Sequence, residues 1–111
     1  MSTVVEIASQ IEKVIAAICK EGKLSKDLIT AKAEAMMNYD KAIAVRSLEL
    51  KDAGMAITLI EKQAKGDASQ LLREKVVAEE SLKAHFARLQ YLQAQQNGFQ
   101  SIFRHLEATS K

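Results

Sequence analysis

The sequence contains no proline and no tryptophan, one cysteine, and only four glycines in 111 residues. Because proline is the residue that most strongly breaks a helix, its absence leaves room for long uninterrupted helices. Aromatic residues make up only 5% of the chain, so its core has to be built from leucine, isoleucine, valine, methionine and alanine. No segment shows the alternation of apolar and polar residues, or the β-branched enrichment, that is typical of strands. These absences predict an all-α fold.

The lone cysteine, Cys19, excludes an intramolecular disulfide and fits a reducing compartment. Its neighbours Ile15 and Ile18 predict that Cys19 is a small buried hydrophobic residue. No apolar run reaches the roughly 18 residues of a membrane span, and Glu6 and Glu12 interrupt the apolar run at the N-terminus, which is unlike a secretory signal. We therefore expect a cytoplasmic protein.

The charges are nearly balanced, with 16 lysines and arginines against 14 aspartates and glutamates and a formal net charge of +2. The two signs are mixed along most of the chain, as on a solvated helical surface. A protein that relies on phosphate contacts normally shows clustered excess base. The charge distribution therefore argues against a dominant nucleic-acid-binding surface, and it does not indicate any other class of partner.

Hydrophobic spacing and capping residues predict one helical domain over residues 1–111. Its expected helices cover about 3–21, 26–53, 57–65 and 68–107. Thr3 and Glu6 have the spacing of a capping box at the start of the first, amphipathic helix. Ser25 is a good N-cap for the second helix.

Apolar stripes define the faces on which these helices should pack. In the second helix, the expected stripe has heptad spacing and consists of Ile29, Met36, Ile43 and Leu50. In the last helix, the expected path consists of Leu71, Ala78, Leu82, Phe86, Leu89, Leu92, Phe99, Phe103 and Leu106. Gly98 interrupts that path and leaves open a kink, a close contact or a break.

The connector between the two long helices is expected to be a structural turn formed by Gly54, Thr58, Gly66 and Asp67. Both glycines are placed where a left-handed or otherwise glycine-permissive backbone would be needed. Thr58 and Glu61 have capping-box spacing, and Asp67 is a candidate cap of the last helix. The predicted architecture is a long antiparallel helical hairpin with a short connector helix, an N-terminal amphipathic helix and coiled-coil-like packing. Such a slender hairpin cannot cover all its apolar stripes, so we expect self-association into a dimer or higher oligomer.

No constellation of residues indicates catalysis, a metal or a cofactor. His85 and His105 are about 30 Å apart along one predicted helix, so they cannot share a metal within one chain, and both are expected to be exposed. The serines, including Ser25, lack the context of a nucleophile elbow. We predict no catalytic, cofactor-binding or metal-binding residues.

A glutamine-rich segment in the last helix is the unusual feature of the composition. Its members are Gln90, Gln93, Gln95, Gln96 and Gln100. We favour a structural interpretation, in which Gln96 helps to set the register of a helical dimer. The functional alternative is a macromolecular partner, either protein or nucleic acid, bound through Arg88, Tyr91, Gln95, Phe99 and Arg104.

Two segments resemble small helical proteins of bacteriophage and prophage early regions. The first, LELKDAGMAITLIEKQAKGD (48–67), is similar to that group's connector, in which a glycine, a Thr-Leu-Ile turn and an Ala-Lys-Gly join two long helices. The second, LQYLQAQQNGFQSIFRHLE (89–107), is similar to its closing pattern. The resemblance covers roughly residues 28–107, and it implies an accessory role in DNA metabolism without assigning any catalytic residue.

Three hypotheses follow. The first is a non-enzymatic interaction or scaffold protein that works as a homo-oligomer. The second is a phage-derived accessory protein that binds nucleic acid or a recombination or replication protein. The third, and least favoured, is a subunit or regulator whose site forms only with a partner.

Overall fold

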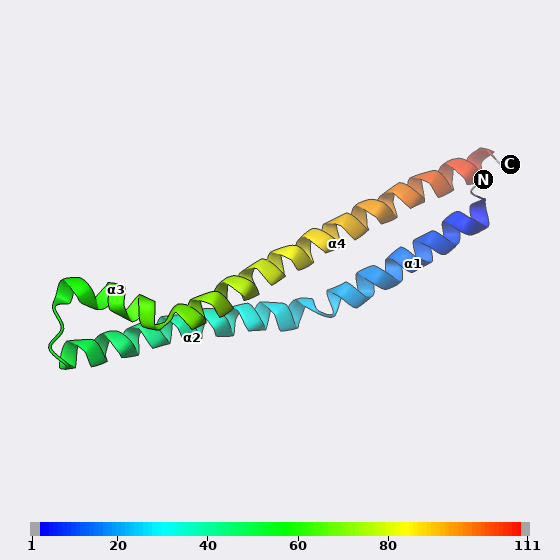
Figure 1. Ribbon diagram of the computed structural model, residues 1–111. Coiled ribbons are helices and arrows are strands. Elements are labelled where there is room, and N and C mark those ends of the chain that lie inside the picture. Colours follow the sequence, from blue (N-terminus) through cyan, green and yellow to red (C-terminus); the bar gives the residue numbers. More distant parts are fainter. Residues whose placement is uncertain (1–2, 110–111) are drawn as a thin grey trace. The chain divides into compact units, whose positions relative to one another are not determined.

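The computed structural model describes residues 3–109, and every secondary-structure element in that range is an α-helix. The helices are α1 (Val4–Gly22), α2 (Ser25–Asp52), α3 (Ile57–Asp67) and α4 (Ser69–Thr109), as Figure 1 shows. The all-α prediction is confirmed, and each expected helix end lies within two residues of the observed one. Gly98 lies inside α4, which is continuous, so this glycine does not break the last helix.

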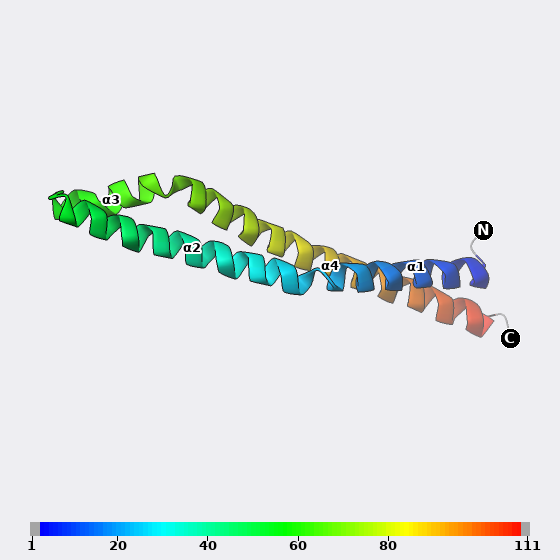
Figure 2. The ribbon, with the colours of Figure 1, turned by 90° about the horizontal axis from the view of Figure 1, so that it is seen from below.

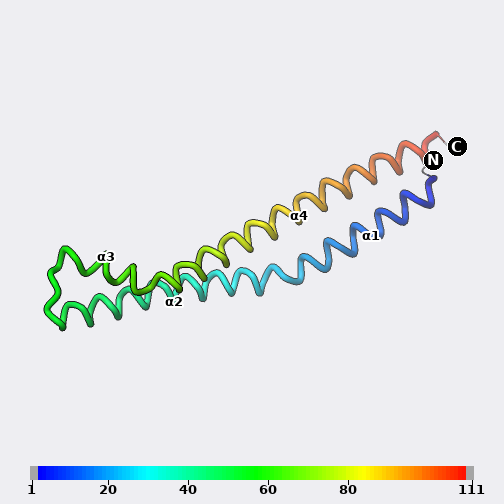
Figure 3. Tube along the Cα trace, viewed as in Figure 1, coloured from blue at the N-terminus to red at the C-terminus, as the bar shows by residue number. Residues whose placement is uncertain are grey.

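Contacts between residues divide the chain into two compact units. Unit 1 contains the described residues up to Ser25 and from Lys83 onward, and unit 2 contains Lys26–Leu82. In unit 1, α1 lies antiparallel beside the C-terminal part of α4 (Figures 1 and 2). In unit 2, α2 runs one way, and α3 and the start of α4 return beside it (Figures 2 and 3). Each unit is therefore a short antiparallel helical pair of its own.

Unit 1 is held together by a seam in which side chains recur at alternating steps of three and four residues. Such a 3.5-residue period is the pattern of a coiled coil. The seam positions that are at least partly buried are Val4, Ile7, Ile11, Val14, Ile18 and Glu21 on α1, and His85, Leu89, Leu92, Gln96, Phe99, Phe103 and Leu106 on α4. Ile7, Val14 and Leu92 are the most buried apolar members. Phe86, which we expected on this path, is exposed because His85 takes its place.

The start of α1 has the structure that the sequence predicted, whereas the predicted burial of Cys19 is not observed. Thr3 Oγ1 accepts from the Glu6 backbone N–H, and the Glu6 carboxylate accepts from the Thr3 N–H, so the predicted capping box is present. Cys19 is exposed, and the prediction that it is buried is wrong. The reason is register: Ile18 is a seam position, and Cys19 lies a further 100° or so around the helix.

The buried core of unit 2 contains few residues, and they are not the stripe that the sequence predicted. Tyr39 and Leu50 of α2 are buried, as are Ala64 of α3 and Ala68. The Lys75 ammonium lies 5.1 Å from the centre of the Tyr39 ring, a cation–π contact between α2 and α4. Two members of the expected heptad stripe, Ile29 and Met36, are exposed, so the prediction placed the centre of the buried face wrongly. The partly buried positions nearest to them include Leu28, Ala35, Ala42 and Ile43.

The connector between α2 and α3 turns at Gly54, whose φ of 86° is in the left-handed region that favours glycine. The other details of the expected turn are wrong. The N-cap of α3 is Ala56, with no side-chain hydrogen bond, so Thr58 forms no capping box. Gly66 lies inside α3 and has no positive φ.

Asp67 ends α3 and does not cap α4. Its carboxylate accepts from Arg46 Nε at 2.8 Å and from Gln63 Nε2 at 2.8 Å. The first of these hydrogen bonds ties α3 to α2. The desolvation of Asp67 is outweighed by the Arg46 contact, which holds the pKa of the Asp67 carboxyl below its ordinary value.

Candidate functional site: a buried polar layer in unit 1

The most distinctive group of side chains in unit 1 is a polar layer formed by Glu21, Ser25 and His85. Glu21 belongs to the last turn of α1, Ser25 begins α2, and His85 lies on the facing side of α4. The His85 side chain is only 2% exposed. Our prediction that His85 is an exposed helical histidine is therefore wrong, because it occupies a seam position four residues before Leu89.

Hydrogen bonds join these three residues in a chain. The Ser25 hydroxyl lies 2.6 Å from His85 Nε2, and His85 Nδ1 lies 3.1 Å from Glu21 Oε2. Ser25 was expected to cap α2, but its hydroxyl is engaged with His85 instead. No buried side-chain nitrogen or oxygen in the described range lacks a partner, so the layer is fully satisfied.

The donors and acceptors in this chain follow from the charge of Glu21. An ionised carboxylate only accepts, so His85 Nδ1–H has to donate to it. In the neutral imidazole, Nε2 then accepts from the Ser25 hydroxyl. One tautomer of His85 therefore satisfies both neighbours at once.

Arg88 completes the layer at its outer edge. Its Nε donates to Glu21 Oε1 at 2.5 Å, and Arg88 lies one turn of α4 beyond His85. Partial burial raises the pKa of the Glu21 carboxyl, but the hydrogen bonds from Arg88 and His85 outweigh that effect and leave the pKa below its ordinary value of 4.5. Glu21 therefore remains ionised near neutral pH, which keeps His85 Nδ1 protonated as a donor.

The order hydroxyl, imidazole and carboxylate is also that of a serine-hydrolase triad. Nucleophilic catalysis further needs a cavity for the substrate beside the hydroxyl and donors for the oxyanion. Two cavities of the described residues, both lined by unit 2, touch none of the three layer residues. What the layer supplies directly is a polar contact that can be satisfied in only one helix register.

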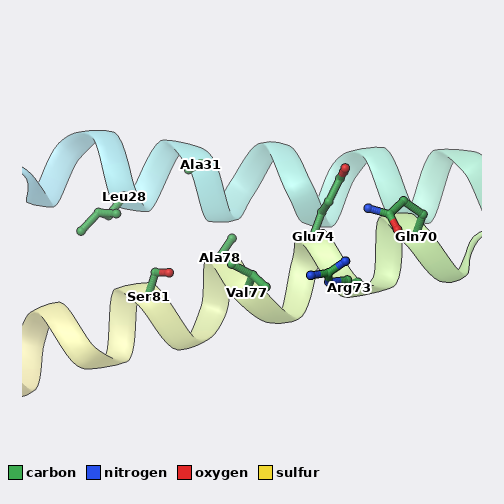
Figure 4. Close-up of a pocket in the computed structure, with 8 residues that line it drawn as sticks. All are labelled: Leu28, Ala31, Gln70, Arg73, Glu74, Val77, Ala78 and Ser81. Carbon is green, nitrogen blue, oxygen red and sulfur yellow. The ribbon is translucent and has the colours of Figure 1, made fainter.

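The first of these cavities is a shallow groove of about 540 Å³ between α2 and α4 of unit 2. Figure 4 shows Leu28 of α2 and Ala78 of α4 lying between the two helices, with Gln70, Arg73 and Glu74 further along α4. The second is a groove of about 640 Å³ between the end of α2 and the start of α3. Each groove has two charged residues in its lining, Arg73 and Glu74 in the first and Lys51 and Glu61 in the second.

The five residues expected to bind a partner do not form one surface. Successive helical residues are about 100° apart, so Arg88, Tyr91, Gln95 and Phe99 share one side of α4, while Arg104 lies about 160° from Arg88 around the helix. Tyr91 is 64% exposed, whereas Gln95 and Phe99 are partly buried. Arg88 Nε donates to the Glu21 carboxylate, and Arg104 Nε donates to the Gln100 carbonyl. Their role in binding stays a prediction.

A signal for the polar layer was present in the sequence, in two series of residues whose spacing alternates between three and four. The series on α1 and the start of α2 is Ile11, Val14, Ile18, Glu21 and Ser25. The series on α4 is Ala78, Leu82, His85, Leu89 and Leu92. Strict adherence to that spacing, rather than to hydrophobicity, places all three polar residues in the seam.

The chain matches no protein-family model, no curated protein and no solved structure at a significant level. The resemblance to phage early-region proteins therefore stays a prediction. Within residues 3–109, no three histidine, cysteine or acidic side chains are grouped so that they could hold a metal ion. No helix in that range combines the length and the apolar character that crossing a membrane requires.

Proposed function

We propose that this chain is a non-enzymatic helical interaction or scaffold protein that works as a homo-oligomer. The observation that carries the proposal is the apolar surface that one copy of the chain leaves exposed to solvent. Both units expose large apolar side chains, for example Val5 and Tyr91 in unit 1 and Leu59 and Val77 in unit 2.

The character of the exposed surface supports the same proposal. No large side chain in the described range is fully enclosed, and most of the exposed large apolar side chains belong to unit 2. Examples are Met37, Leu48 and Ile57, which are each at least 60% exposed. Apolar surface of this kind is stabilised when another helix covers it.

The polar layer fits a protein whose work is specific helix pairing. A single polar group in an apolar seam costs stability but selects one register, because any slip leaves it without a partner. Glu21, Ser25 and His85 would select the pairing of α1 with α4 in this way. A reducing, cytoplasmic location agrees with a single cysteine that has no partner within the chain.

Sedimentation velocity of the intact chain tests the proposal. We expect a dimer or larger species at micromolar concentration, and a monomer up to millimolar concentration would contradict it. A parallel titration with single-stranded DNA at two salt concentrations tests the alternative role in DNA metabolism. Binding that weakens steeply with salt would favour that alternative, since each phosphate contact releases a counterion.

A further inference from the structure

We propose that a second copy of this chain docks antiparallel on one face of α2, with the two-fold axis passing between Ala44 and Ser47. This inference rests on the proposed homo-oligomer and specifies the surface that forms it. The face spans about 120° of the helix. Its members, called here the α2 face, are Ile29, Ala33, Met36, Asp40, Ala44, Ser47, Leu48 and Lys51, all exposed except the partly buried Ser47.

The α2 face leads into the groove between α2 and α3. Ala44, Ser47, Leu48 and Lys51 line one wall of that groove, and Ile57, Ile60 and Glu61 line the other. Leu48 is 62% exposed and Ile57 is 83% exposed. The C-terminal part of the face therefore borders an apolar depression of about 640 Å³, whose lining also includes one cation, Lys51, and one anion, Glu61.

Charge complementarity on the α2 face favours a second copy at this position and sets its antiparallel orientation. Asp40 and Lys51 are 11 residues apart, which is about three helical turns, so they lie on the same side of α2 about 16 Å from each other. No side-chain hydrogen bond or ion pair joins Asp40 or Lys51 to another described residue, although both take part in backbone hydrogen bonds. In a two-fold contact, residue i meets residue j while j meets i. An antiparallel pair therefore brings each Asp40 opposite the other copy's Lys51, forming two ion pairs per dimer.

The positions between these charges suit a close crossing. The axis that pairs Asp40 with Lys51 also pairs Ala44 with Ser47, and both of these side chains are small enough to let the two helix backbones approach. Leu48 and Ile57 then lie beside the axis, where each copy can cover the other's groove. A parallel arrangement would instead place Asp40 against Asp40 and Lys51 against Lys51, which like-charge repulsion disfavours.

A charge-swap series measured by sedimentation equilibrium tests this surface. Asp40→Lys and Lys51→Asp each create two like-charge contacts per dimer, so each should raise the dissociation constant at least tenfold. The double variant Asp40→Lys/Lys51→Asp restores opposite charges and should return the dissociation constant to within threefold of the unmodified chain. Glu12→Lys, on α1, makes the same change in net charge as Asp40→Lys and should leave association unchanged.

The outcomes separate this inference from the proposed function. If the unmodified chain associates but the single variants associate equally well, the α2 face is wrong while the homo-oligomer stands. The same conclusion follows if the double variant fails to recover although its helicity and melting temperature match those of the unmodified chain. If the unmodified chain is monomeric, the proposed function fails first. Weakening in both single variants and recovery in the double variant is the result expected.

Discussion

Removal of the His85 imidazole should destabilise the fold far more than an ordinary change on the surface of a helix. His85→Ala deletes a side chain that is 2% exposed and occupies a seam position of α4, four residues before Leu89. It also removes both hydrogen bonds of the polar layer, to Ser25 and to Glu21.

The expected magnitude follows from these two losses. Each hydrogen bond contributes about 0.5–1.5 kcal/mol to the free energy of unfolding. The vacated space adds the loss of packing that accompanies truncation of a buried side chain. Together they predict a decrease of about 2–4 kcal/mol, a substantial part of the roughly 5–15 kcal/mol typical of a domain. His85→Leu retains most of the volume but neither hydrogen bond, so its decrease should be about half as large.

Urea unfolding followed by circular dichroism at 222 nm measures these differences, provided that all variants are compared at one protomer concentration. His105→Ala is the matched control, because His105 is exposed on the same helix, and its effect should stay within about 0.5 kcal/mol. If His85→Ala were no more destabilising than His105→Ala, the polar layer would not be a structural element of unit 1.

The remaining predictions concern two glycines and the loss of stability at acidic pH. Gly98 lies inside α4 with open space where a Cβ would be, so Gly98→Ala should raise the free energy of unfolding by up to about 1 kcal/mol in the same urea assay. Gly54 also has space for a Cβ, but its φ of 86° should make Gly54→Val destabilising by about 1 kcal/mol or more; a neutral or stabilising result there would count against the turn. The folded pKa of Glu21 is lowered, so its contribution is complete above its ordinary pKa of 4.5 and is lost as the pH falls through the folded value. Glu21→Gln should accordingly flatten the fall in melting temperature below about pH 4.5, and an unchanged pH profile would contradict the pairing with Arg88 and His85.

The sequence predicted the helices well because their ends depend on local chemistry. The Thr3 and Glu6 capping box and the left-handed Gly54 both act within a few residues of chain. The same local reasoning failed at Asp67, because its carboxylate accepts a hydrogen bond from Arg46 of another helix.

The choice of buried face depends on the partner helix and was predicted less well. Hydrophobicity favoured Phe86 over His85 for the seam, although the two are adjacent in sequence. Contacts from the facing side select the register that contains His85, because Glu21 and Ser25 supply its partners there. A buried polar residue of this kind becomes predictable only when the two facing helices are aligned together.

The dependence of stability on protein concentration tests most directly the claim that association covers the apolar surface left open in one copy. Folding coupled to dimer formation gains about 4 kcal/mol of apparent stability when the protomer concentration rises about a thousandfold, for example from about 1 μM to about 1 mM. With a urea dependence of about 1–3 kcal/mol per molar, the unfolding midpoint should then increase by more than about 1 M over this range. A midpoint that does not change between these two concentrations would contradict the account.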